Sequence, residues 1–427
     1  MFQMSQCEPA VRHALVAIGA LNERRDAFIR DLAHQNSSSR NCPRSTDQIV
    51  ASGQQRRHDD PFAIAQYNKA MSCLQRTLGE SGSISVDSTL LSCILFICVE
   101  CLRGDWQLAM RHYYAGMAIA LDASQNNNSS HHPLQSSGLR QQLLRSFNRL
   151  ELLSQLFGHR PTYEYCVEPL RAVPTEFASI VQARDSIVHL MNLSLRFIHS
   201  KTPRRFRAKI ITSQDYEKRS ILLGSLEVWR QALSHFLETN PPCPHLTEAS
   251  TVLQLHQIVT TTWLNRCLSP SETATDPDIP LYQRAVSLAE TLQNQPSSSS
   301  SSSSFFSSSP SCPSTFLLDM QTISPLYLLA LKCRHAPTRR RAIALLRRSV
   351  RREGLWDSQK AAAVAARVVE LEEEGLWPKD GSVLPAEEKR VWNVRVVDEG
   401  PGLGTTEFRV VFTRGAGRWV EGLRVGG

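Results

Sequence analysis

The sequence predicts an all-α protein, a multi-helix bundle or array of packed helical hairpins with a small β-hairpin at its C-terminal end. Three observations predict this fold class. Apolar residues recur at three- and four-residue steps through most of the 427 residues. The densest apolar segment, residues 90–121, divides into two such helices. Strand-like alternation of apolar and polar residues occurs only after Pro385.

The segment Leu90–Leu121 is the centre of the predicted fold. Up to Leu102 its only polar side chains are Ser92 and Glu100, so this first helix is apolar on nearly all sides and must be surrounded by protein. It is too short to span a membrane, which takes about 20 apolar residues. We expect the chain to turn at residues 103–104 and to start a second helix there.

The second helix of this hairpin has a narrower apolar stripe and a set of small residues. The stripe recurs on one face, and the small side chains let a neighbouring helix approach closely. The stripe comprises Trp106, Met110, Tyr113, Met117 and Leu121, and the small residues are Ala109, Gly116 and Ala120.

The same periodicity predicts the other helices, several of which have recognisable ends. Asp60 precedes Pro61 as a helix cap, and Gly79 suits the end of that helix. The predicted helices cover residues 9–35, 61–79, 138–158, 176–200, 213–239, 244–268, 280–294, 315–335, 337–352 and 357–374.

Polar and low-complexity stretches divide the chain. Residues 36–59 and 124–137 are predicted flexible loops, and the serine tract within 296–314 is a predicted disordered linker, because such segments cannot bury enough apolar surface to fold. The helical domain then comprises residues 1–295 and closes with 315–384. A C-terminal β-hairpin and tail occupy residues 385–427, with strands at Val391–Val396 and Glu407–Phe412 around a glycine-rich turn at 400–404.

Composition places the chain in an intracellular class. The net charge of +8 is mild, and much of it comes from one arginine cluster. Eleven cysteines are scattered, mostly within apolar helical patterns, whereas secreted disulfide scaffolds are short and cysteine-dense. No signal peptide or membrane span is evident.

No residue pattern predicts an enzyme, a metal site or a cofactor. Cys98 and Cys101 form a CxxC, but inside an apolar helix they are expected to be buried core thiols rather than zinc ligands. His131 and His132 lie in a predicted loop. The nucleophile-elbow, metalloprotease, phosphate-loop and kinase motifs are all missing.

The arginine cluster admits two interpretations. Arg339, Arg340 and Arg341 could form a nuclear localisation signal or contact phosphate. Alternatively, the cluster is a surface paired with the acidic run Glu370–Glu374. The full cluster comprises Arg334, Arg339, Arg340, Arg341, Arg347, Arg348, Arg351 and Arg352.

Four stretches taken in order resemble a known family. They are Val11–Leu21; Tyr67–Met71; Gly104, Asp105, Trp106, Arg111, His112 and Gly116; and the segment from Ala342 that ends in Arg352, Glu353, Gly354, Leu355 and Trp356. Together they resemble the fungal-specific transcription factor regulatory domain, the helical region of fungal binuclear zinc-cluster regulators.

The resemblance assigns these residues structural roles. Gly104 would allow the tight corner, and Trp106 would anchor it by burying apolar area worth a few kcal/mol. Gly354 would form a helix C-terminal turn, from which Leu355 and Trp356 fold back onto the core.

The resemblance also implies transcription regulation in the nucleus. The partners would be proteins of the transcription machinery or a related regulator, with effector binding, a homodimer and control of secondary metabolism as options. The family's six-cysteine zinc cluster is absent, since Cys7 and Cys42 are 35 positions apart. Direct sequence-specific DNA binding is therefore not expected, and either the cluster lies upstream of Met1 or this relative lacks it. The alternatives are a cytosolic helical scaffold and an enzyme with a pocket between helices.

Overall fold

The computed structural model describes residues 6, 8–38, 60–79, 85–127, 138–156, 172–206, 211–294, 316–398 and 407–425. The serine-rich linker at 296–314, the glycine-rich turn at 400–404 and most of the two predicted loops lie outside these residues. The chain forms two compact units: residues 1–150, 303–318 and 399–406 make the first, and residues 151–302, 319–398 and 407–427 make the second.

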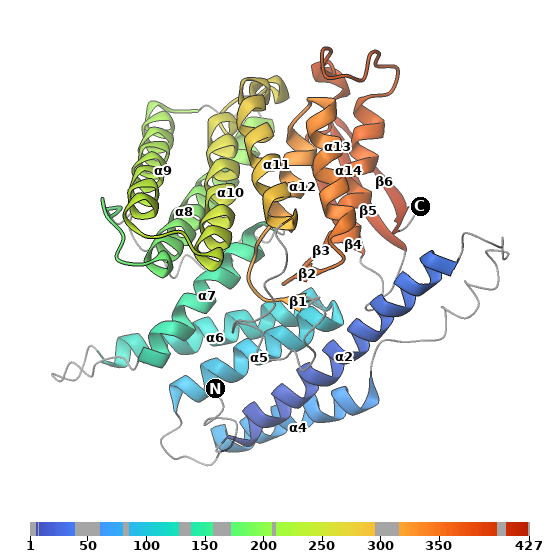
Figure 1. Cartoon of the computed structure of the whole chain (residues 1–427). Helices are drawn as coiled ribbons and strands as arrows, with labels where there is room; N and C mark the ends of the chain where they lie inside the picture. The colour runs from blue at the N-terminus through green and yellow to red at the C-terminus, as the bar shows by residue number, and fades with distance from the viewer. Residues whose placement is uncertain are drawn as a thin grey trace. The chain divides into compact units, whose positions relative to one another are not determined.

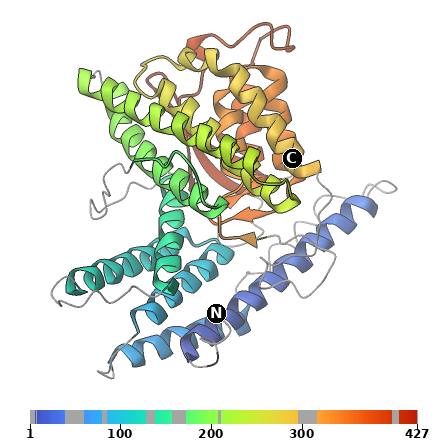
Figure 2. The same cartoon turned by 60° about the vertical axis from the view of Figure 1, so that its left-hand side comes forward.

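The first unit is built around the predicted central hairpin. Helix α2 packs along α4 and α5, and α5 packs on α6, as the blue and cyan helices of Figures 1 and 2 show. The described residues of this unit form α2 (Pro9–Ser38), α4 (Pro61–Gly79), α5 (Val86–Arg103), α6 (Trp106–Asn127), the first part of α7 (Gly138–Leu156) and β1 (Phe316–Leu317).

Helix α5 is buried on all sides, as its composition predicts. Every residue from Ser88 to Leu102 is buried. Its first turn is capped by Ser85, whose hydroxyl accepts a hydrogen bond from the Ser88 N–H. The end of α2 at Ser38 and of α6 at Asn127 corrects the predicted loop starts at 36 and 124, since both helices run into the polar sequence.

The second unit is an array of helices in which each packs on its neighbours. Helix α10 contacts α8, α9 and α11, while α12, α13 and α14 pack on one another. Its elements are the end of α7, α8 (Ile180–Phe206), α9 (Ser213–Thr239), α10 (Pro244–Arg266), η1 (Glu272–Asp278), α11 (Ile279–Asn294), α12 (Ile323–Lys332), α13 (Ala336–Arg348), α14 (Ser358–Glu372) and η2 (Glu387–Lys389).

Two strand groups belong to the second unit. Strand β2 (Arg352–Glu353) pairs antiparallel with β3 (Trp356–Asp357). Strands β4 (Asn393–Asp398), β5 (Glu407–Arg414) and β6 (Gly417–Arg424) form an antiparallel sheet in that order. The predicted terminal hairpin therefore has a third strand, which the sequence analysis missed because Gly417 and Gly422 interrupt an otherwise weak alternation.

Predicted helix boundaries hold for most of the chain and fail near these short strands. The helix predicted over 315–335 begins only at Ile323, after β1, and the one predicted over 337–352 ends at Arg348. The all-α class with a small C-terminal sheet is confirmed. In the part of the chain that the structure describes, no helix has the length and apolar character needed to cross a bilayer.

Candidate functional site

The turn between α5 and α6 contains the first group of signature residues. Gly104 has a φ of +81°, a left-handed conformation that favours glycine, and its N–H bonds the Cys101 carbonyl. The Asp105 carboxylate accepts from the Leu108 N–H at 3.0 Å and thereby caps the start of α6. Trp106 is half-buried and Arg111 is exposed.

His112 connects this hairpin to α4. Its Nε2 lies 2.7 Å from the Tyr67 hydroxyl, and its ring meets the Phe96 ring edge-on. Burial raises the pKa of Tyr67 well above its usual value, and the carboxylate of buried Glu100 acts in the same direction. Burial also lowers the pKa of His112, so this group is neutral and structural in the folded state.

Gly116 lies where α6 closely approaches its neighbouring helices. A Cβ placed there would lie 2.4 Å from Cζ of Phe147 and 3.3 Å from Cβ of Cys93. Only glycine fits, because such a separation lies far inside van der Waals contact.

The second group of signature residues forms a hairpin rather than the predicted helix C-terminal turn. Glu353 pairs with Trp356 across the turn at Gly354 and Leu355, and Gly354 has a φ of +53°. The prediction was wrong because α13 has already ended at Arg348. Trp356 does fold onto the core, with its ring centroid 5.1 Å from that of Tyr327.

Glu353 closes the N-terminal end of α12. Its fully buried carboxylate accepts from three successive backbone N–H groups, those of Gln321, Thr322 and Ile323, at 2.9, 3.1 and 3.0 Å. These N–H groups have no partner within the helix, and the helix dipole favours a negative charge at this end. Arg351 adds an ion pair at 3.0 Å. Buried Arg352 lies 3.9 Å from Asp357, which caps α14.

A buried ionic cluster lies between η1, α12, α13, α14 and the start of β4. The Glu272 carboxylate lies 3.0 Å from both Lys332 Nζ and Arg334 Nη2, and 3.6 Å from Arg266 Nη1. All four residues are buried. Burial lowers the pKa of Lys332 to about 7, against the attraction of Glu272.

Glu372 is the second anion of this cluster. Its carboxylate lies 3.1 Å from Arg334 Nη2 and 2.8 Å from Arg339 Nη1, and it accepts from the Val391 N–H at 2.8 Å. Burial alone would raise the pKa of Glu372, but the two guanidinium groups hold it below its ordinary value.

The cluster also fixes the segment that leads into the sheet. Lys332 donates to the Trp392 carbonyl at 2.8 Å. Arg390 forms a two-bond fork with Asp276 at 2.7 and 2.8 Å and donates to the Glu272 carbonyl. The cluster thereby ties helices of the second unit to its C-terminal sheet.

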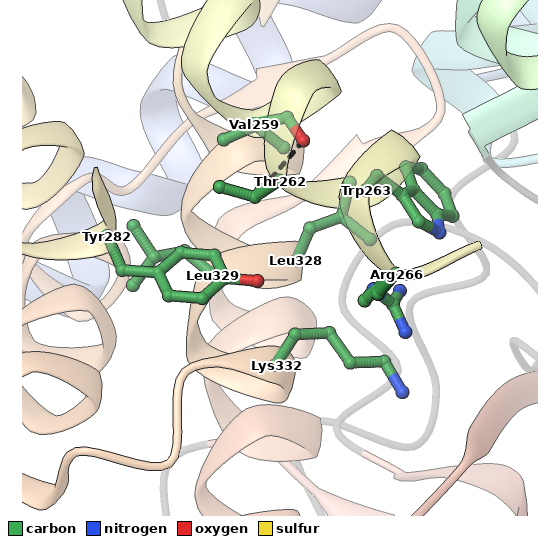
Figure 3. A pocket seen from close by; sticks show the side chains of 8 residues that line it. All are labelled: Val259, Thr262, Trp263, Arg266, Tyr282, Leu328, Leu329 and Lys332. Atoms are coloured by element: carbon green, nitrogen blue, oxygen red, sulfur yellow. Dashed lines mark hydrogen bonds between the residues drawn. The ribbon is translucent and has the colours of Figure 1, made fainter. Parts of the chain in front are cut away.

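A small pocket opens beside the cluster, between α10, α11 and α12 (Figure 3). Trp263, Tyr282 and Leu328 are among its walls. The Thr262 hydroxyl is already bonded to the Val259 carbonyl at 2.9 Å, and the Lys332 ammonium to Glu272. The pocket has room for about one water molecule and offers no arrangement for catalysis.

The arginines proposed for nuclear localisation differ in exposure. Arg339 is fully buried against Glu372, whereas Arg340 and Arg341 are about 40% exposed and pair with Glu373 and Glu290. The arginine cluster therefore does pair with the acidic run, but the central pair of Arg339 and Glu372 is buried and does not lie on a solvated surface. A receptor could reach only Arg340 and Arg341 without unfolding α13.

The remaining candidates from the sequence have structural surroundings. Cys98 and Cys101 are buried within α5. His131 and His132 lie outside the described residues. Among the residues that the structure does describe, no three His, Cys, Asp or Glu side chains are grouped as a metal site.

Of the buried ionic cluster, only the pairing between the arginines and the acidic run was predicted from the sequence. Glu272 and Lys332 are 60 residues apart, and helical periodicity carries no information on such pairs. The available signal was a lysine and an arginine, Lys332 and Arg334, directly after the apolar run of α12.

Comparison with known proteins supports the resemblance. The chain is 23% identical over 397 residues to the aspercryptin biosynthesis cluster-specific transcription regulator atnN of Emericella nidulans. That alignment covers 75% of this chain and 64% of the relative, so the chain spans less than two thirds of its relative's length. No solved structure matches the chain.

The family model for the fungal specific transcription factor domain matches residues 1–368. This range includes both groups of signature residues, the turn at Gly104 and the hairpin at Gly354, and every described α-helix up to the last turn of α14. The chain therefore belongs to the fungal-specific transcription factor domain family.

Proposed function

We propose that this chain regulates transcription in the nucleus and acts through protein partners or a small effector. The observation that carries the proposal is the family match over residues 1–368. The geometry agrees with it, because the signature residues stabilise helix packing and none of them forms a catalytic arrangement. The relative in Emericella nidulans is named a transcription regulator, which supports the same function for this chain.

We also propose that the regulated genes belong to secondary metabolism, and this part of the proposal rests on that relative alone. Its name describes a regulator specific to one biosynthetic cluster. At 23% identity we transfer only the class, a regulator of a biosynthetic gene set, and not the aspercryptin genes themselves.

A tethering experiment tests the regulatory role. The chain is fused to a heterologous DNA-binding module, and a reporter gene carrying that module's site is assayed. We expect reporter output to change relative to the module alone, and Gly116→Val, which disrupts the first unit, to abolish the change. Unchanged output with a stably expressed fusion would contradict the proposal.

Localisation separates this proposal from the cytosolic scaffold. We expect a tagged chain to accumulate in the nucleus and Arg340→Ala with Arg341→Ala to reduce that accumulation. The matched control is Arg347→Ala with Arg348→Ala, two exposed arginines at the end of the same helix. Nuclear exclusion of the unmodified chain would favour the scaffold.

A further inference from the structure

The outer face of the C-terminal sheet presents a set of arginines. The register of β4, β5 and β6 places alternate residues on two faces. Phe408, Val410 and Phe412 occupy the inner face and are buried. On that side β6 packs on α14, and Glu421 pairs with Arg367 at 2.7 Å. The outer face carries four exposed arginines: Arg395, Arg409, Arg418 and Arg424.

Three of these arginines lie on one diagonal across the sheet. Arg395 is opposite Val411, two residues from Arg409, and Arg409 is opposite Gly422, two residues from Arg424. Diagonal neighbours in an antiparallel sheet are about 7–8 Å apart. A line of arginine residues with this spacing therefore crosses all three strands.

The charge of this face is positive. Glu407 on this face pairs with Arg424, and in the backbone register Asp398 is opposite Arg409. Arg395 and Arg418 have no ion-pair partner within the described part of the chain. Arginine is well suited to phosphate, because its planar fork matches the phosphate oxygens.

We propose that this face binds the phosphate backbone of duplex DNA without sequence preference. A duplex is favoured over a single strand because Phe412 and Trp419 stack on each other on the inner face, so no aromatic ring of the described strands is on the outer face for bases to stack on. The sheet is three strands wide, whereas the major groove admits a two-stranded ribbon, so backbone contact is expected rather than base readout.

Fluorescence anisotropy with the full chain and a labelled duplex tests the proposal. We expect salt-dependent binding that is equal for unrelated sequences. Arg395→Glu with Arg418→Glu should lower the affinity at 0.1 M salt by a factor on the order of 50 and reduce the salt slope by about 2, because each phosphate contact contributes about 0.9 to the slope. Arg395→Lys with Arg418→Lys should retain most of the binding.

The matched control is Lys69→Glu with Arg76→Glu, which changes the net charge equally at exposed positions on α4. This control should bind as the unmodified chain does. Circular dichroism and thermal unfolding check that all variants fold.

The proposal would be overturned by a lack of duplex binding, by an equal loss in the control, or by displacement by poly-glutamate that is as effective per charge as displacement by DNA. The last result would indicate an acidic protein partner. Tighter binding of an RNA duplex would also refute the DNA assignment. Since the tethering experiment supplies its own DNA-binding module, failure here leaves the regulatory proposal standing.

Discussion

Arg334 and Glu372 form an ion pair in the interior of the second unit, with Nη2 and Oε1 3.1 Å apart and neither side chain exposed. A buried pair of this kind does not by itself prove a gain in stability, since desolvation opposes the attraction. Its importance lies in what remains when one partner is lost. Glu372 also serves Arg339 and the Val391 N–H, so three groups depend on one carboxylate.

Glu372→Gln should therefore destabilise the protein strongly. The change removes the nearest anion of Arg339 at 2.8 Å and leaves Arg334 with Glu272 alone, and we expect a loss of about 3–5 kcal/mol in the free energy of unfolding. Urea denaturation measures it. The control is Glu370→Gln on the same helix, whose side chain is 64% exposed and whose loss should cost under about 0.5 kcal/mol. Equal effects would refute the importance of the buried cluster.

Gly116→Ala should destabilise the first unit by about 1–3 kcal/mol, because the new methyl group collides with Phe147. The matched control is Gly224→Ala in α9, where a Cβ meets nothing within 4 Å. There we expect a gain of about 0.5–1 kcal/mol, since alanine favours a helix. Thermal unfolding compares the two. A shift in the same direction for both would contradict the close contact.

Glu353→Gln should weaken the N-terminal end of α12. The amide keeps an oxygen but loses the charge that favours three backbone N–H groups, and we expect a cost of about 1–3 kcal/mol. The rate of hydrogen exchange should increase most at the backbone N–H groups of Gln321, Thr322 and Ile323. If exchange there matches the unmodified chain, the carboxylate does not stabilise this helix end.

Features set by neighbouring residues could be predicted from the sequence, whereas features set by distant residues could not. Helices α4 and α9 were predicted to the residue, because periodicity and caps are local features. Strand β6 and the hairpin at Gly354 were missed, since short strands depend on their partners for definition. The pairs of Glu272 and of Arg390 with Asp276 join segments 60 and 114 residues apart, which no local pattern encodes.

His256 should make stability depend on pH in mild acid. Burial lowers the pKa of His256 to about 4, and its Nε2 lies 2.7 Å from the Gln321 carbonyl, to which it donates. The unfolded chain takes up a proton near pH 6.5, so it binds more protons than the folded state between pH 4 and 6.5. Stability should fall across that window as pH decreases, by up to about 3 kcal/mol. Unfolding in urea at pH 7.5, 6 and 5 measures this, and His256→Gln should flatten the profile. An unchanged slope in the variant would assign the effect to other groups.

Lys332 should make stability depend on pH in the same direction, but in mild base. Its pKa of about 7 in the folded protein lies below the value near 10.4 of an unfolded chain, so the unfolded state binds more protons between pH 7 and 10. Stability contributed by this group should therefore rise with pH there, by at most about 1.4 kcal/mol per pH unit.

Lys332→Met removes the buried ammonium and leaves Glu272 paired with Arg334 at 3.0 Å. We expect the variant to lose this rise in stability and to stay within about 1 kcal/mol of the unmodified chain at pH 7, because a packed apolar side chain often replaces a buried charge without loss. Glu272→Met is the contrasting variant: it removes the anion paired with Lys332, leaves Arg334 with Glu372 alone, and should cost about 3–5 kcal/mol. If Lys332→Met proves the more damaging of the two, Lys332 stabilises the cluster as a cation and the pKa shift assigned to its burial is wrong.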